Sequence, residues 1–525
     1  MSQPEENKNE NSEKGEKMIV DQDDRESDIR IERVTDNTNQ KIQNANNESD
    51  SKKVSSLETI RSIWNTMIGS SIVSIPYNVY YAGIIPTIII GLLYGFICYF
   101  TCNIIVRLGG EEEEFAKVVY NYFKYGLGKK YAKVGKVLQI TFNLMINIGA
   151  TFIYFLIINQ NLFPCICFFL KKMFGVDIDD EDITPYFNKF SLFYCALIVS
   201  VAVFPITILK EMGILVRFNS YGIYFVSALL IYVIYNGIYT LAKDNLHFGY
   251  KENIKDKSVK DRYLLLFGEN PGMLAGTLSL GLFCHSVILP ILKNNRKPQN
   301  NQRDLLCGYT LVTLTYIIIG IMGYIGFSGS RFDTDFKDNW FRFFKSDDIF
   351  ILILRMLNVA QLISIFPILF CSVRNQLFKA FFERYLSSKF HIVLFSVILL
   401  LLCILVLYFC YNTLGILISL IGASTALVLI YSIAPITNMI YYYIRHQTKE
   451  EVQKILDEKK AENGNSNEEE KIFPDNLREP VTLKPIKAFF FYLSMMMIIT
   501  VGVITLTLQI VSVNFFNVKI EKNQI

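Results

Sequence analysis

The stretch NTMIGSSIVSIPYN, Asn65 to Asn78, places small polar residues and a proline where the chain turns from polar to apolar. A helix that crosses a bilayer needs about 20 mostly apolar residues and satisfies its backbone groups internally. The residues that work against such a helix here are Gly69, Ser70, Ser71, Ser74 and Pro76. This composition predicts that the helix is interrupted at mid-depth.

A second apolar segment, GTLSLGLFCHSVILPILKN from Gly276 to Asn294, has the same kind of defect. Its interrupting residues are Gly281, Cys284, His285, Ser286 and Pro290. Two interrupted segments in corresponding places of two halves indicate a secondary transporter built from inverted repeats.

Interrupted helices expose backbone groups that can bind a charged ligand. The N–H groups at the start of a half-helix carry partial positive charge, and the carbonyls at the end of one carry partial negative charge. We therefore expect N–H groups near Ser70 and Ser71 to bind a carboxylate and carbonyls near Ile68 to bind a cation. An amino acid carries both charges. The alternative is that the small residues serve close helix packing and the proline is a simple kink.

The composition places these segments in a polytopic membrane protein. Of 525 residues, 51% are hydrophobic and 14% aromatic, and apolar runs of spanning length recur along the chain. The net charge of +4 is spread over loops and tails and forms no basic stripe, so the sequence does not indicate a nucleic-acid-binding protein. The predicted spans are residues 60–81, 83–107, 137–164, 190–209, 217–242, 272–292, 305–328, 349–373, 391–410, 412–444 and 487–514.

The expected fold is all-α, with eleven transmembrane helices arranged as a 5+5 inverted repeat plus one appended helix. Lys and Arg are more numerous in the loops that would face the cytosol if the N-terminus is cytosolic, which places the C-terminus outside. The predicted regions are a disordered cytosolic tail (1–56), a ten-helix core (57–444, with repeats at about 57–242 and 272–444), a cytosolic linker (445–486), and the eleventh helix with a short tail (487–525).

Several motifs resemble those of one family, the amino acid/auxin permeases. NTMIGSSIVSIPYNVYYAG resembles the family's first-helix signature, and LGLFCHSVILPI resembles its sixth-helix signature. FPITILKEMGILVRFNSYG is similar to the family's link between helices four and five, and FPILFCSVRNQLF to the end of its eighth helix. The form of the first motif is most similar to the sodium-coupled neutral amino acid branch and its lysosomal relatives.

The resemblance implies a leucine-transporter-like fold, a cytosolic N-terminus and amino acid transport. The substrate-lining residues that it implies are Asn65, Thr66, Met67, Gly69, Ser70, Ser71, Phe283, Cys284 and His285. The cation site that it implies uses carbonyls near Asn65 and Ile68 together with the Ser364 hydroxyl.

Few ionisable residues lie within the predicted spans, and Asp and Glu are absent from them. Proton coupling would therefore rest largely on His285. The alternative role for His285 is structural, as a neutral imidazole that is hydrogen-bonded within the broken helix. A Na⁺ ion needs only neutral oxygen ligands, so the sequence allows either Na⁺ or H⁺ as the coupling ion. Arg355 is expected to reach toward the outer face and pair with Asp347 or Asp348. A cationic substrate would need a carboxylate partner, so a neutral amino acid is favoured.

The function expected from these residues is secondary active transport of amino acids by alternating access, coupled to Na⁺ or H⁺. Two alternatives stay open: a sensor that binds an amino acid with little flux and signals to a protein partner of the tail, and, more remotely, a membrane enzyme that uses His285. No cofactor or metal besides the coupling ion is expected, because no second ligand pair accompanies Cys165 and Cys167. The plasma membrane and the vacuolar or lysosomal membrane are both compatible with the sequence.

Overall fold

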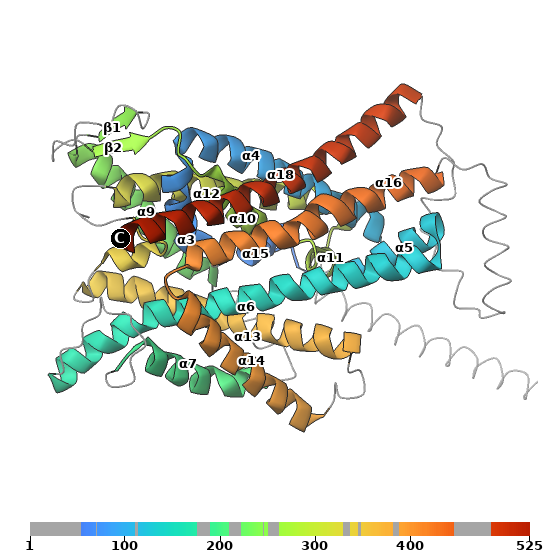
Figure 1. Ribbon diagram of the computed structural model, residues 1–525. Helices are drawn as coiled ribbons and strands as arrows, with labels where there is room; N and C mark the ends of the chain where they lie inside the picture. The colour runs from blue at the N-terminus through green and yellow to red at the C-terminus, as the bar shows by residue number, and fades with distance from the viewer. Residues whose placement is uncertain are drawn as a thin grey trace, which may run out of the picture.

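The computed structural model describes residues 54–524, apart from 70, 111–113, 176–189, 209–221, 245, 250–261, 294, 329–335, 345–347, 382–387 and 446–484. Most of the predicted tail and linker therefore lies outside the described residues, as does the acidic run Asp177 to Asp182. The described chain is a bundle of long helices with nearly parallel axes, crossed by α14 at one side (Figure 1).

The first half of the bundle contains α2 (Ser56–Met67), α3 (Ser71–Ala82), α4 (Ile84–Gly109), α5 (Phe115–Leu127), α6 (Lys129–Phe174), α7 (Leu192–Thr207) and α9 (Gly222–Lys243). The second half contains α10 (Pro271–Gly281), α11 (Ile288–Lys293), α12 (Asn301–Phe327), α13 (Ile349–Phe381), α14 (Lys389–Cys410), α15 (Leu414–Val428), α16 (Ala434–Arg445) and α18 (Pro485–Gln524). Short 3₁₀ turns are η2 (Pro298–Asn300) and η3 (Trp340–Phe343), and the π-helical turn η5 (Leu429–Ile433) joins α15 to α16.

Eight of the described helices are long and apolar enough to cross a membrane. The three remaining predicted spans correspond to α7, which has 16 residues, and to the two helix pairs α2–α3 and α10–α11. Each pair is interrupted, so neither member reaches the length of a spanning helix. The mostly helical, multi-pass class is confirmed, and the exact count of eleven crossings stays a prediction.

Local sequence signals set several helix ends. Ser55 caps α2, because its hydroxyl accepts from the Glu58 N–H while the Glu58 carboxylate accepts from the Ser55 N–H. Gly83 separates α3 from α4 at φ 84°, a conformation that favours glycine. Pro271 occupies the first position of α10, where its missing N–H costs nothing. Ser55 and Gly83 thus mark the two ends of the first predicted span, and Pro271 marks the start of the sixth.

Two features of the segments between the spans were not predicted from the sequence. The segment between the second and third spans, expected to be loop up to residue 136, contains α5, and α6 already begins at Lys129. The described chain also contains two short strands, β1 (Leu246–Gly249) and β2 (Arg262–Leu265), which pair in parallel beside the helices. We call the two ends of the bundle the α5 end and the β end after these elements (Figure 1).

The centre of the bundle is α10, which packs against α3, α4, α15 and α18. Glycines allow the closest of these approaches. A Cβ on Gly422 of α15 would lie 2.0 Å from the Gly276 carbonyl oxygen, and a Cβ on Gly276 would lie 2.3 Å from the Ser419 carbonyl oxygen. Small residues at such crossings let helix backbones touch inside a membrane.

Candidate functional site

The first predicted interruption is present. α2 ends at Met67 and α3 begins at Ser71, while Ser70 lies outside the described residues. Ile68 leaves the helical conformation with φ −76° and ψ 88°, and the Gly69 N–H turns back to the Met67 carbonyl at 2.9 Å. The backbone therefore stops its i to i−4 pattern at the place where the sequence carries small and polar residues.

The sixth span is interrupted as well. α10 ends at Gly281 and α11 begins at Ile288, and residues 282–287 form turns. In this segment the Val287 N–H donates to the Cys284 carbonyl at 3.0 Å. The predicted residues Phe283, Cys284 and His285 all lie in the interruption. The prediction of two broken helices is thus confirmed, one in each half of the chain.

One side chain connects the ends of the two broken helices. The hydroxyl of Tyr316, on α12, lies 2.7 Å from the Met67 carbonyl oxygen and 3.4 Å from the Gly281 carbonyl oxygen. Tyr309, seven residues earlier on the same helix face, donates to the Leu282 carbonyl at 3.2 Å. Both rings are buried. The C-terminal carbonyls of α2 and α10 therefore meet tyrosine hydroxyls from a single helix.

A third tyrosine lies against the first interruption. A Cβ added to Gly69 would be 2.2 Å from the hydroxyl oxygen of Tyr154 on α6. Only glycine leaves room for that hydroxyl. Tyr154 and the two α12 tyrosines were not predicted as site residues, because 30 tyrosines are scattered along the chain and nothing local distinguishes these three.

His285 is fully buried and makes one described hydrogen bond, between its Nε2 and the Thr101 hydroxyl at 2.9 Å. That hydroxyl also lies 2.9 Å from the Ile97 carbonyl, to which it donates its single proton. With that proton donated to Ile97, Nε2 is the donor in the contact with Thr101. Nδ1 is buried and has no hydrogen-bond partner among the described atoms.

Sulfur atoms pack beside the interruption in the sixth span. The Cys284 Sγ lies 3.3 Å from the Tyr309 hydroxyl and 3.8 Å from the Cys102 Sγ on α4. All ten cysteines are free thiols, and no group of potential metal ligands occurs among the described residues. Cys284 thus contributes packing and one weak hydrogen bond to the interrupted segment.

The remaining predicted site residues differ in their burial and in their partners. Asn65, Met67 and Ser71 are buried next to the first interruption. Thr66 is exposed and donates to the Ser62 carbonyl at 2.7 Å. The hydrogen bond described for Ser364 stays within its own helix, to the Gln361 carbonyl at 2.6 Å, so its place in a cation site stays a prediction.

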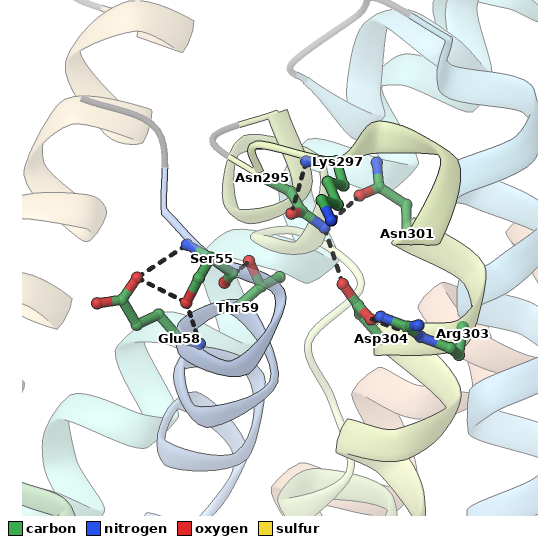
Figure 2. Close-up of polar contacts among 8 residues, drawn as sticks. All are labelled: Ser55, Glu58, Thr59, Asn295, Lys297, Asn301, Arg303 and Asp304. Carbon is green, nitrogen blue, oxygen red and sulfur yellow. Dashed lines mark hydrogen bonds and ion pairs between the residues drawn. The ribbon is translucent and has the colours of Figure 1, made fainter. Parts of the chain in front are cut away.

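One face of α2 is polar and exposed from its capped start to the interruption. The residues of this polar stripe of α2 are Glu58, Arg61, Ser62 and Thr66. At its start, Figure 2 shows the Ser55–Glu58 capping box beside a network around Asn295. The backbone N–H and hydroxyl of Ser55 hold the pKa of Glu58 below its ordinary value. In a membrane protein, exposed polar side chains along one helix face are expected to meet water rather than lipid.

A backbone contact beside this network fastens the start of α2 to the connection between α11 and α12. The Arg296 N–H donates to the Val54 carbonyl at 2.9 Å, and the buried Asn295 amide donates to Asp304 at 2.9 Å. Asp304 also accepts from Arg303 at 2.9 Å. The start of α2 is thus held by the connection between α11 and α12, and further along α2 packs against α12, where the Trp64 indole donates to the Thr315 hydroxyl at 3.2 Å.

The β end is covered by the segment that contains η3. The Asn339 amide donates to Gln160 of α6 at 3.0 Å, and the Gln160 amide donates to the Tyr411 carbonyl at 2.6 Å. Asp338 accepts from the Leu414 N–H and from Arg342, both at 3.1 Å. Stacked rings then join this segment to α3, through Tyr80 and Phe336, and to α9, through Tyr232 and Trp340.

Arg355 points toward the β end and is 2% exposed under the η3 segment. Its guanidinium donates to the carbonyls of Phe341 and Phe344, at 2.9 and 2.8 Å. Asp348 accepts from the N–H groups at the start of α13, and Asp347 lies outside the described residues. Arg355 thus helps to hold the cover in place.

Asp338 gives the cover a dependence on pH. Burial raises the pKa of this carboxyl, against the opposing effect of Arg342. A raised folded-state pKa means that the folded protein binds the proton more tightly, so stability is lost as pH rises from the ordinary Asp value near 3.9 through the folded pKa. We expect Asp338→Asn to gain in Tm relative to the wild type as pH rises from about 4 to about 7. A constant difference in Tm across this range would contradict the assignment.

The comparisons with known proteins agree with this geometry. The model of the family described as "Transmembrane amino acid transporter protein" matches residues 52–459. The chain belongs to this family. The resemblance to amino acid/auxin permeases is therefore confirmed, and the chain is a multi-pass membrane protein of an amino acid transporter family rather than an enzyme.

Curated relatives of this family member cover most of both chains. The chain is 26% identical over 443 residues to "Neutral amino acid transporter 9" of Xenopus tropicalis, which covers 76% of each chain. It is 25% identical over 428 residues to "Sodium-coupled neutral amino acid transporter 9 homolog" of Caenorhabditis elegans, covering 73% of this chain and 68% of the relative.

Among solved structures, the transporter resembles the one titled "Inward facing conformation of Mhp1", with a TM-score of 0.51 and 10% identity. The match covers 90% of this chain and 92% of that chain. At this identity the likeness speaks for the fold, and it confirms the predicted leucine-transporter-like class.

Proposed function

We propose that this chain moves neutral amino acids across a membrane by alternating access, coupled to Na⁺ or H⁺. The observation that carries the proposal is the meeting of two interrupted helices at Tyr316, which gathers the exposed backbone dipoles of both repeats in one place. Backbone N–H groups at the start of α3 would bind the substrate carboxylate, and carbonyls at the end of α2 would face its ammonium group or a cation.

The two ends of the bundle support alternating access. The polar stripe of α2 is exposed toward the α5 end, whereas the β end is covered by the η3 segment. Access to the site from one side only is the arrangement that a secondary transporter requires. We assign the α5 end to the cytosol, in line with the lysines of α5 and of the start of α6, and the N-terminus with it.

The substrate class is supported by the residues around the site. The described interruptions are lined by backbone groups, tyrosine hydroxyls, a thiol and one imidazole, and their described residues include no carboxylate to pair with a cationic side chain. The relatives' names contain "neutral amino acid", which agrees with this composition. The C. elegans relative is also named as sodium-coupled, which favours Na⁺ as the coupling ion.

A variant of His285 tests whether H⁺ is the coupling ion. Thr101 uses its proton on a carbonyl, so the imidazole donates at Nε2, and its complete burial favours the neutral ring. We expect His285→Gln, which keeps a donor near Thr101, to retain uptake within about threefold and to leave the dependence of uptake on pH unchanged, since a proton relay contributes about 10²-fold or more. Loss of that pH dependence in the variant would instead identify His285 as the proton carrier.

Uptake into proteoliposomes tests the proposal. Purified protein would be offered a panel of neutral, acidic and basic amino acids under an imposed Na⁺ or H⁺ gradient, with protein-free vesicles as the control. We expect a neutral amino acid to accumulate under one of the two gradients. Binding without accumulation would support a sensor in place of a transporter.

A further inference from the structure

The first turns of α6 expose a row of apolar side chains along one face of the helix. The members of this apolar stripe of α6 recur every three or four residues and are between 43% and 57% exposed: Tyr131, Val134, Leu138 and Met145. Thr141, which is also exposed, fills the gap in the row. An exposed apolar row of this kind fits lipid rather than water, so the lipid-facing surface of α6 continues to the α5 end.

Four lysines lie on the same turns of the helix. They form the basic ridge of α6, and all of them are exposed: Lys129, Lys130, Lys133 and Lys136. Because each residue of an α-helix turns by about 100°, Lys130 lies beside the apolar stripe and the other three continue around the helix toward α5. The Lys136 Nζ lies 5.7 Å from the centre of the Tyr120 ring on α5, which packs along this part of α6 (Figure 1).

The described surroundings leave the ridge positively charged. Asp and Glu are absent from residues 115–145, which contain α5 and the start of α6, and Glu114 precedes α5. Among the described residues, none of the four lysines forms an ion pair. Lys117 and Lys124 on α5 add further positive charge, as does Arg445 at the end of α16, which packs on α5. Opposite charge for the ridge has to come from a partner.

The length of the helix places the ridge at the level of lipid headgroups. The predicted third span begins at residue 137, directly after the ridge. Residues 129–136 rise about 11 Å along the helix axis, and the headgroup layer on each side of a bilayer is about 5–8 Å thick. Flexible lysine stems extend the reach of the ammonium groups. The ridge thus crosses the phosphate layer, while the apolar stripe enters the hydrocarbon.

We propose that the basic ridge of α6 binds the headgroups of anionic phospholipids, with the apolar stripe of α6 against their acyl chains. Lysines next to a membrane surface attract anionic headgroups such as phosphatidylserine, whereas phosphatidylcholine has no net charge to offer them. The bundle therefore selects its neighbouring lipids at the α5 end. This property is independent of the transported amino acid and of the coupling ion.

Fluorescence quenching beside the ridge measures this selection. The reporter is a fluorophore on Thr141→Cys, about 8 Å along the helix from Lys136, after the half-buried Cys307 and Cys410 have been replaced with serine. The purified protein is reconstituted in phosphatidylcholine vesicles that contain either brominated phosphatidylserine or brominated phosphatidylcholine. A second reporter on Phe169→Cys, which is 55% exposed on the same helix toward the β end, is the positional control.

Brominated phosphatidylserine should bind about fivefold more strongly than brominated phosphatidylcholine beside Thr141→Cys, the preference that one lysine near the surface provides. The two lipids should quench Phe169→Cys equally. Raising the salt concentration from about 0.1 M to about 1 M should remove most of the preference, because the Debye length falls from about 10 Å to about 3 Å.

Replacing all four lysines of the ridge with glutamine should remove the preference at Thr141→Cys. Lys171→Gln combined with Lys172→Gln is the matched control, because these exposed lysines lie at the other end of the same helix, and it should retain the preference. Equal quenching by the two lipids at Thr141→Cys, or a preference that survives loss of the ridge, would overturn the proposal. If the fourfold variant does not fold, the salt series decides, and a preference that is insensitive to salt would overturn the proposal.

Discussion

Replacing Gly69 with alanine should lower amino acid uptake by roughly tenfold to a hundredfold, the cost expected when a reacting or binding group is displaced by about 1 Å. The added Cβ would lie 2.2 Å from the Tyr154 hydroxyl oxygen, so either the interrupted backbone or the tyrosine must move. The N–H groups that we assign to the substrate carboxylate belong to this backbone. Initial uptake rates at saturating and limiting substrate would show the loss as a raised KM.

A double variant identifies the cause of that loss. Without the hydroxyl, the nearest ring atom of residue 154 would lie 3.2 Å from the new Cβ, a tight but tolerable contact. Gly69→Ala combined with Tyr154→Phe should therefore recover most of the uptake that Gly69→Ala loses, relative to Tyr154→Phe alone. If the two effects simply add, the steric explanation is wrong.

The largest effect on stability is expected from Gly422→Ala. The new Cβ would lie 2.0 Å from the Gly276 carbonyl oxygen, and backbone atoms cannot move aside as a side chain does. Overpacking of this kind costs about 3 kcal/mol or more when no rotamer can relieve it. We expect little monodisperse protein after solubilisation and a clearly lowered Tm. Ser424→Ala, which adds no atom to the same helix, is the control, and equal stability of the two variants would contradict the close α10–α15 crossing.

The interruptions could be predicted from sequence because their cause is local. Gly69, Ser71 and Pro76 are poor residues for the middle of a spanning helix, and the run around His285 repeats the pattern in the second half. The family resemblance then added the leucine-transporter-like class to the inverted-repeat arrangement that the two interruptions had indicated. The broken helices and the multi-pass class followed from these two sources.

The partners of the interruptions could not be predicted, because they come from distant parts of the chain. Tyr316 meets Met67 across 249 residues of sequence, and Tyr154 meets Gly69 from a third helix. Apolar spans carry little periodicity that would reveal which face is turned inward, since both lipid and core accept the same side chains. The position of a tyrosine within such a span does not disclose its partner.

Helix boundaries failed for a different reason. The lysine-rich start of α6 was assigned to a loop because charged residues do not belong in the hydrocarbon core. A helix of 46 residues is about 69 Å long, more than twice the thickness of that core of about 30 Å. Its first turns can therefore be helical and charged outside the membrane, which a hydropathy reading does not detect.

The proposed transport requires an amino acid to bind between the two interrupted helices. The most direct measurement is a cryo-EM map of the reconstituted protein prepared with a saturating neutral amino acid and, as a reference, without it. We predict that new density appears between residues 68–71 and 282–287, with its carboxylate toward the start of α3. Density for the amino acid elsewhere in the bundle, with this region unchanged, would contradict the account.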